Sequence, residues 1–322
     1  MAVFRASLCL CLVVLMPAPL LAWGSIGHMT VAYVAYQHLT PAAKARVRDL
    51  LVLNPDLASW EKQVPAGTSA EDHDRIMFMI AATWADDIKG DSRYSDEGSD
   101  PNTADGVTSS QNIGYADLFR HRYWHFIDTP FSPDHTMLPA IAAPNAETEI
   151  AAFRAVLAST EPDELKSYDL VWLLHLIGDI HQPLHATTRV TSADRKGDAG
   201  GNKVQLLGDA SANVHAYWDD LPGLDCSFCS KKIRCVERAA TLAKTLKPAN
   251  PASARNLSVA IWIQESFQAA RTVVYRAPIG GADGPYTIAP SSFYETAALH
   301  LAKARLALAG ARLAEVLNHE MK

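Results

Sequence analysis

The stretch LLHLIGDIHQPLH, residues 173–185, places three histidines and one aspartate inside an apolar run. Such groups are costly to bury unless each finds a hydrogen-bond partner or a metal ion. Residues four apart lie on one face of a helix, so His175 and Asp179 point the same way. Pro183 disturbs the helix, and His185 follows near its end. The stretch predicts a buried helix that aims these groups inward, although hydrogen-bonded core histidines are the commoner explanation of such a pattern.

Further segments carry the same kinds of side chain. His215 and Asp219, in NVHAYWDD, again stand four apart, a spacing suited to one tetrahedral metal ion. The other candidates lie in short aromatic or acidic segments: His125 in YWHFID, Asp86 in TWADDIK, and Trp23 with His28 in WGSIGH. Each has a simpler explanation alone, since a helical aspartate is usually solvated and a histidine beside an aromatic ring is often packed. Together, nitrogen and oxygen ligands without thiolate fit zinc in an exported enzyme.

The first 22 residues predict a secretory signal peptide. Arg5 precedes an apolar run over residues 8–16, and small Ala22 offers a cleavage site. The run is too short to span a membrane, although an N-terminal anchor is the alternative. Cleavage there would leave residues 23–322 as one domain, beginning at Trp23 and secreted or periplasmic.

Three of the five cysteines lie beyond the predicted signal peptide, namely Cys226, Cys229 and Cys235. Three clustered thiols make an incomplete structural zinc site. In an exported chain we expect one disulfide among them, without a choice of partners.

Composition and periodicity predict one mostly α-helical domain with long loops and at most a short β-hairpin. Hydrophobic residues make up 48% of the 322, and the net charge of −6 argues against binding duplex nucleic acid through a basic surface alone. Helical periodicity predicts helices over 25–39, 74–88, 147–157, 168–182, 253–274 and 291–317. Residues 90–114 predict a surface loop, KVQLL a short strand, and RYWHFID a strand or an irregular segment.

The ordered set WGSIGH, WAD, HFID, HLIGDIHQPLH, GGN and NVHAYWD resembles the S1/P1 nuclease family. The resemblance runs from Trp23 to Asp219, and the helices that follow are compatible with that family's all-α fold. It implies a secreted zinc-dependent endonuclease that hydrolyses single-stranded DNA and RNA to 5′-phosphate products, with 3′-nucleotidase activity. It implies no stable protein partner, and we expect no membrane binding.

The resemblance also implies three Zn²⁺ ions and their ligands. The first zinc would be held by Asp86, His125, His175 and Asp179, and the second by His185, His215 and Asp219. The third would be held by His28 and by the free amine and carbonyl of Trp23, with Asp179 as the bridge to the first. His181 is not among the implied ligands, so we expect it to be structural or to support a ligand.

Catalytic and substrate-binding roles follow from the same resemblance. Asp86 would orient the attacking water, and Lys89 would neutralise charge that develops on the phosphate, unless it is a solvated surface charge. Phe126 would stack on an unpaired base, unless it packs in the core. Asp128 would accept hydrogen bonds from a base edge, and Asn202 would lie close to the metal ions.

Two other functions compete with this prediction. A secreted zinc phospholipase C is one, but in that family the first histidine lies farther from the N-terminal tryptophan and the last helical pair ends in glutamate. Here His28 follows Trp23 by five residues and the pair ends in Asp219. The other is a non-catalytic zinc-binding protein, which turnover would exclude.

Overall fold

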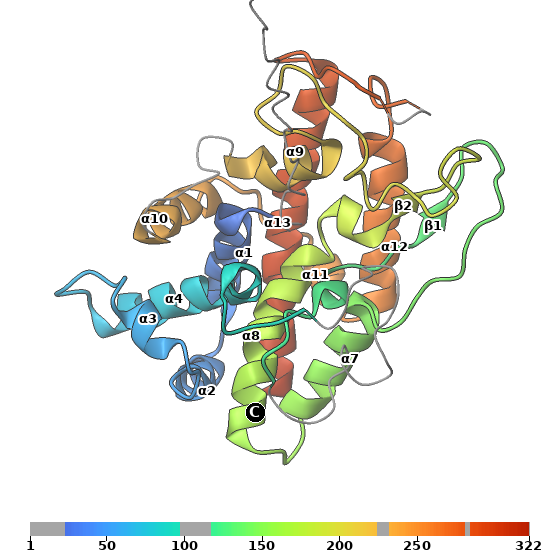
Figure 1. Ribbon diagram of the computed structural model, residues 1–322. Coiled ribbons are helices and arrows are strands. Elements are labelled where there is room, and N and C mark those ends of the chain that lie inside the picture. The colour runs from blue at the N-terminus through green and yellow to red at the C-terminus, as the bar shows by residue number, and fades with distance from the viewer. Residues whose placement is uncertain (1–22, 97–116, 224–231, 281–283, 322) are drawn as a thin grey trace, which may run out of the picture.

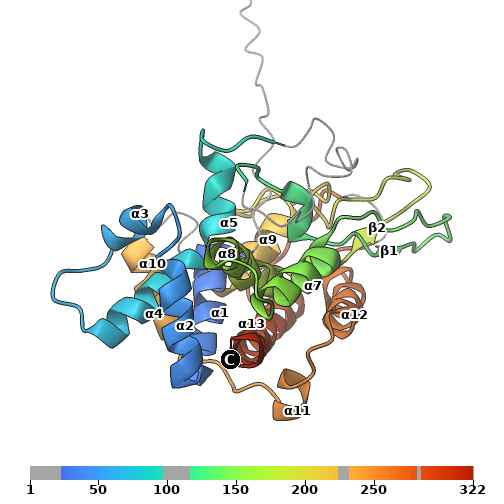
Figure 2. The ribbon, with the colours of Figure 1, turned by 90° about the horizontal axis from the view of Figure 1, so that it is seen from below.

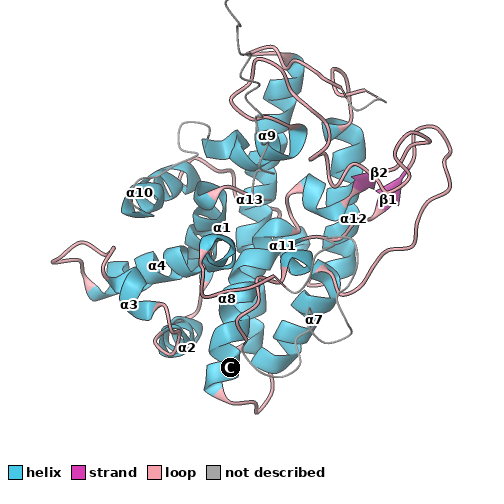
Figure 3. Cartoon of the chain, viewed as in Figure 1, coloured by secondary structure: helices cyan, strands magenta, loops and turns pink. Residues whose placement is uncertain are grey.

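The computed structural model describes residues 23–96, 117–223, 232–280 and 284–321. The predicted signal peptide, much of the predicted 90–114 loop, and Cys226 and Cys229 lie outside these ranges, so the expected disulfide stays a prediction. The described part is mostly helical (Figure 3), which confirms the predicted fold class.

The α-helices of the described part follow one another in this order: α1 (Ser25–His38), α2 (Pro41–Leu51), α3 (Leu57–Glu61), α4 (Ala70–Ala81), α5 (Trp84–Asp87), α7 (Ala146–Leu157), α8 (Asp163–Asp179), α9 (Val214–Asp220), α10 (Lys232–Ala243), α11 (Pro251–Ala254), α12 (Val259–Ala269) and α13 (Phe293–Glu320). Shorter 3₁₀ turns are η1 (Ile88–Gly90), η2 (Arg122–His125), η3 (Pro183–Ala186) and η4 (Leu221–Gly223). A π-helical turn, η5 (Ala270–Val274), continues α12.

Helix α13 is the axis of the fold. It runs through the middle of the molecule in Figure 1 and is seen nearly end-on in Figure 2, with α1, α8 and α12 around it. Gly310 lets α1 approach closely, because a Cβ there would lie 2.6 Å from the Cβ of Val34 and 2.8 Å from the carbonyl oxygen of Val31. The first and last long helices of the described chain therefore pack directly on each other.

Helix α8 is the buried helix that the opening stretch predicts. Every residue from Leu165 to Asp179 is buried. It begins at Asp163, five residues earlier than predicted, since acidic residues suit the first turn of a helix and Asp163 also pairs with Arg46. Beyond Asp179 the chain turns and enters η3 at Pro183.

The predicted helix 74–88 is wrong in its bounds, because the chain breaks after Ala81. The carbonyl oxygen of Ala82 accepts a hydrogen bond from His175 Nδ1 at 2.9 Å, so a contact with α8 bends the chain there. After the break, the short helix α5 runs in a new direction and places Asp86 near α8. The predicted helix 253–274 is likewise divided, into α11, α12 and η5.

The β-structure differs from the predicted hairpin. Two short strands, β1 (Pro130–Phe131) and β2 (Thr188–Arg189), pair in parallel with Pro130 opposite Thr188. They join the segment after His125 to the segment after His185. KVQLL does not form the predicted strand: Gln205 and Leu206 make single bridges only. None of the described helices has the length and apolarity needed to span a membrane.

Candidate metal centre

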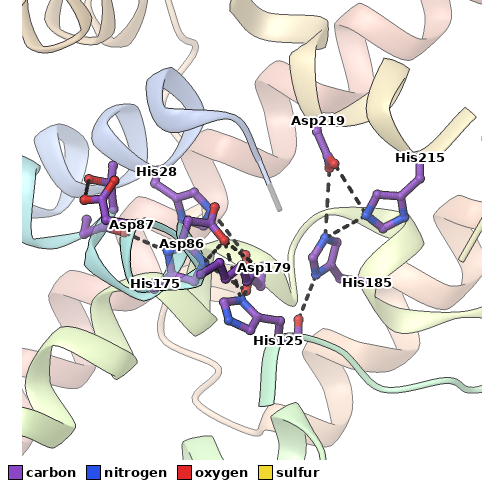
Figure 4. A network of polar contacts seen from close by, with 12 residues as sticks. His28, Asp86, Asp87, His125, His175, Asp179, His185, His215 and Asp219 are labelled. Carbon is purple, nitrogen blue, oxygen red and sulfur yellow. Dashed lines mark hydrogen bonds and ion pairs between the residues drawn. The ribbon is translucent and has the colours of Figure 1, made fainter. Parts of the chain in front are cut away.

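The Asp179 carboxylate is the centre of the larger group of candidate ligands (Figure 4). Its Oδ2 lies 3.0 Å from His125 Nδ1 and 3.3 Å from His175 Nε2, and its Oδ1 lies 3.2 Å from His28 Nε2. Asp86 Oδ1 reaches the same group, 3.6 Å from His175 Nε2. Four elements distant in sequence, α1, α5, η2 and α8, thus contribute side chains to one cluster.

A second group lies where η3 meets α9. His185 Nε2 and His215 Nε2 are 3.2 Å apart, and Asp219 Oδ2 lies 3.4 Å from His215 Nε2. The N-cap residue Asn213 starts α9 by accepting a hydrogen bond from Ala216 N, and the helix then presents His215 and Asp219 on one face. Gln182 donates to Asp219 Oδ1 at 2.7 Å and fixes that carboxylate.

Backbone carbonyls orient three of the rings. His175, His185 and His215 each place Nδ1 within 2.9 Å of a carbonyl oxygen, of Ala82, His125 and Gly200 respectively. A carbonyl only accepts, so each Nδ1 carries the proton and each Nε2 presents its lone pair to the cluster.

A cation bound between His185 and His215 is compatible with this tautomer assignment. When both Nδ1 atoms are protonated, two lone pairs face each other across 3.2 Å, which is repulsive unless a positive charge lies between them. In the larger group, His28 Nε2, His175 Nε2 and Asp179 Oδ1 are buried and make no hydrogen bond within the described residues. The donor sets therefore fit metal ions, and three groups of residues could each hold one: His28–His175–Asp179, Asp86–His125–His175 and His185–His215–Asp219.

The candidate ligands differ in their electrostatics: the pKa of His175 is raised because Asp179 and Asp86 outweigh burial, whereas the pKa values of two other rings are lowered. Burial lowers the pKa of His28 to about 4 and of His125 to about 3, so both rings are neutral near pH 7. Burial alone would raise the pKa of Asp86, but nearby Lys89 and His175 outweigh it and lower that pKa. Burial raises the pKa of Asp219 well above its usual value, although the hydrogen bond from Gln182 opposes the rise.

Trp23 is placed beside both groups. Its indole Nε1 donates to the carbonyl oxygen of Gly178 at 3.0 Å, and the next residue, Gly24, donates its N–H to the Asp219 carbonyl oxygen at 3.0 Å. Residue 23 thus lies between α8, which carries Asp179, and α9, which carries Asp219.

The predicted substrate-binding residues line a cavity of about 200 Å³ next to the metal groups. Lys89, Phe126, Asp128 and Asn202 all face it, together with His125, His185 and His215. Lys89 Nζ lies 2.6 Å from Asp86 Oδ1, so this lysine touches a candidate ligand. The structure thus brings the predicted site residues to one place.

Asp128 has unusual acid–base behaviour. Burial raises the pKa of its carboxyl to about 7, the negative charge of Asp198 adds to the rise, and Lys203 opposes it. The carboxyl therefore changes its charge near neutral pH.

His181 lies outside the three groups. Its Nδ1 donates to the Ile177 carbonyl oxygen at 2.7 Å, and its Nε2 lies 3.0 Å from Arg312 Nη1. Arg312 and Arg305, both buried on α13, pair with Glu265 of α12 at 2.7 and 2.9 Å. These contacts give His181 a structural role, which is one of the two roles expected from the sequence.

Sequence reasoning missed Gly178, which has no side chain to signal its role. A Cβ at this position would lie 2.8 Å from His28 Nδ1, so only glycine lets the His28 ring reach Asp179. The need for glycine arises from the close approach of α1 to α8. This contact joins segments distant in sequence, so local sequence patterns do not predict it.

Replacing Gly178 with alanine is expected to displace His28 and to lower activity by roughly 10- to 100-fold, the range found when groups that orient metal ligands are lost. Lower helix propensity cannot be the cause, because alanine favours a helix by about 1 kcal/mol over glycine. Metal content and initial rate measure the effect. Gly90→Ala, which meets nothing within 4 Å, is the matched control. Equal activity of the Gly178 variant and wild type would contradict the crowding argument.

The fold and the site define a class: a mostly helical protein in which histidines and aspartates from distant segments could hold several metal ions at the edge of a cavity. The chain belongs to the S1/P1 nuclease family, whose model matches residues 23–322.

Individual relatives are more distant. The chain is 26% identical over 203 residues to nuclease S1 of Aspergillus oryzae, which covers 61% of this chain and 53% of that protein. It is 26% identical over 204 residues to nuclease P1 of Penicillium citrinum, covering 61% and 57%. The matched part thus spans little more than half of these two relatives. Endonuclease 2 of Arabidopsis thaliana is 24% identical over 305 residues, covering 92% of this chain and 89% of that protein.

Proposed function

We propose that this protein is a secreted, zinc-dependent endonuclease that hydrolyses single-stranded DNA and RNA to 5′-phosphate products and also acts on 3′-nucleotides. The observation that carries the proposal is the pair of buried His/Asp groups beside a cavity walled by Phe126 and Lys89. Family membership supports a nuclease, and the single-strand preference is argued from the cavity.

The proposed metal set is three Zn²⁺ ions held by nine residues: Trp23, His28, Asp86, His125, His175, Asp179, His185, His215 and Asp219. Clustered zinc ions activate water and stabilise negative oxygens in phosphodiester hydrolysis. The bridging role of Asp179 is supported by its contacts with His28 through Oδ1 and with His125 and His175 through Oδ2.

Side chains of the protein would orient the attacking water, stabilise the phosphoryl charge and bind the base. Asp86 orients the attacking water, while Lys89, 2.6 Å from that carboxylate, stabilises charge on the phosphoryl oxygens. Phe126 stacks on a base and Asp128 accepts hydrogen bonds from its edge. A base can enter so small a cavity only after leaving its stack, which costs least for an unpaired nucleotide.

The deciding experiment compares initial rates of the zinc-loaded mature chain on five substrates. These are matched single- and double-stranded oligodeoxynucleotides, single-stranded RNA, 3′-nucleotides, and phosphatidylcholine vesicles. We expect both single strands to be cut, duplex much more slowly, and lipid not at all. Hydrolysis of lipid alone would identify a phospholipase C, and no turnover of any substrate would identify a zinc-binding protein.

An additional methionine before Trp23 is expected to lower zinc from about three toward two ions per chain and to reduce the rate sharply. The change converts the α-amine of residue 23 into an amide, which is a poor zinc ligand. Metal analysis and initial rates of the chain with and without the extra residue measure this effect. Equal zinc content in the two forms would remove the amine from the ligand set, while leaving the other two sites in place.

Asp128→Asn is expected to raise KM for single-stranded DNA several-fold at pH 8 and hardly at pH 5. Because the pKa of Asp128 is raised to about 7, the side chain is a carboxylate at pH 8 and accepts only, whereas at pH 5 it is a neutral acid that donates and accepts as asparagine does. KM measured across pH 5–8 for wild type and variant tests this. If the ratio of the variant KM to the wild-type KM stayed constant from pH 5 to pH 8, the charge of Asp128 would have no effect on substrate binding.

A further inference from the structure

The cavity beside the metal groups is lined by more cations than a single phosphate requires. Lys89, Arg122, Lys196 and Lys203 line it, against one carboxylate, that of Asp128. The chain as a whole has a net charge of −6, so this concentration of positive charge is local. Lys89, in contact with Asp86, belongs to the proposed reaction centre. The proposed function assigns no role to Arg122, Lys196 or Lys203.

Arg122 forms one edge of the cavity. It opens η2, three residues before His125, and its side chain is about 31% exposed, so it faces both the cavity and solvent. Its Nε donates to Asp96 at 2.8 Å, and Arg120 shares that carboxylate at 3.3 Å. Two guanidinium groups on one carboxylate leave a net positive charge, and the bond through Nε uses one of five N–H donors of Arg122. The residue can therefore still bind an anion.

Lys196 lies on the loop between β2 and α9, with its side chain exposed at the cavity. The loop is held firmly: Asp198 is buried and accepts from the backbone N–H groups of Arg189 and Gly201 at 2.9 and 3.2 Å. Lys203 Nζ donates to Asp194 Oδ2 at 2.6 Å and to the Gly197 carbonyl oxygen at 2.7 Å. Lys203 thus braces the loop, and Lys196 is the lysine that it presents to solvent.

We propose that Arg122 and Lys196 bind backbone phosphates that flank the scissile one, so that a single strand is held from two segments of the cavity rim. The inference rests on the proposed function. It adds that the enzyme binds oligonucleotides more tightly than mononucleotides. A 3′-nucleotide has no flanking phosphate, so the two cations would contribute nothing specific to its binding. A longer strand gains a contact at each cation, and each contact releases counterions.

The test uses Arg122→Gln and Lys196→Gln in the zinc-loaded chain, with Lys62→Gln, an exposed residue away from the cavity, as the matched control. The first readout is KM for a ten-nucleotide oligothymidylate and for a 3′-nucleotide between 50 and 200 mM salt. The second is binding of a phosphorothioate oligothymidylate, which resists cleavage, followed by fluorescence anisotropy over the same salt range. Zinc content and melting temperature check that each variant folds.

We expect each cavity variant to weaken oligonucleotide binding about 5- to 10-fold at low salt and to reduce the slope of log affinity against log salt by about 0.7, the single-strand value for one lost phosphate contact. KM for the 3′-nucleotide should change less than about twofold. Unchanged slopes, or equal effects on the 3′-nucleotide and the oligonucleotide, would overturn the inference. The binding arm separates the two proposals: if wild type binds the oligothymidylate but cuts nothing, the proposed function fails and the slopes still decide this inference.

Discussion

Replacing Asp179 with asparagine is expected to lower kcat/KM on single-stranded DNA on the order of 10³-fold, about 4 kcal/mol of transition-state stabilisation. The reason is the position of this carboxylate, which is fully buried and lies within 3.3 Å of nitrogen atoms of His28, His125 and His175. An amide keeps the shape but removes the negative charge that would bridge two metal ions. Initial rates and zinc content of the purified variant measure the effect.

Asp87→Asn is the matched control for this prediction. Asp87 follows candidate ligand Asp86 directly, but its side chain is 40% exposed and pairs with Lys232. We expect this variant to keep its zinc and to lose little activity. Chelation of wild type should reproduce the Asp179 loss and also lower the melting temperature, because buried ligands without metal destabilise the fold. If the Asp179 and Asp87 variants lost activity equally, the bridging role of Asp179 would be contradicted.

The second large effect concerns stability and lies away from the metal groups. Glu265→Gln is expected to destabilise the fold by about 3 kcal/mol, the low end of the range for breaking a buried ion pair, because Glu265 is partly exposed. The glutamate is the shared anion of Arg305 and Arg312, whose side chains are 7% and 0% exposed. Without it, two guanidinium groups stay buried with neutral acceptors only. Thermal unfolding measures the loss as roughly 5–10 °C.

The pH dependence of this effect has a definite sign. Burial alone would raise the pKa of Glu265, but its two arginine partners outweigh burial and lower it. The stabilisation is therefore present above the unfolded value of about 4.3 and is lost as pH falls through the lower folded value. The control is Glu71→Gln, whose side chain is 75% exposed. A melting temperature of Glu265→Gln equal to that of the control at pH 7 would contradict the prediction.

The sequence predicted what depends on local spacing. Four-residue separations placed His175 with Asp179 and His215 with Asp219, and the structure finds these pairs 3.3 and 3.4 Å apart. The buried character of α8 also followed from its apolar run. These predictions hold because a helix fixes the relative positions of its own side chains.

What failed to be predicted depends on contacts between distant segments. The helix over 74–88 breaks because the Ala82 carbonyl oxygen bonds to His175, 93 positions away. The two strands pair in parallel across 58 residues, where short-range rules favour hairpins. The carbonyl oxygens of His125 and Gly200 fix the rings of His185 and His215, and a backbone carbonyl has no identity in a sequence.

The central position of α13 has a consequence for how the protein is made. Every candidate ligand lies between residues 23 and 219, whereas the helix on which α1 packs closely begins at residue 293. During synthesis the full ligand set emerges well before this supporting surface exists. In the folded chain, α1 contacts both α13, where Gly310 meets Val34, and α8, where His28 meets Asp179. A fragment ending at residue 223 would therefore carry all the candidate ligands but lack the α13 surface on which α1 packs.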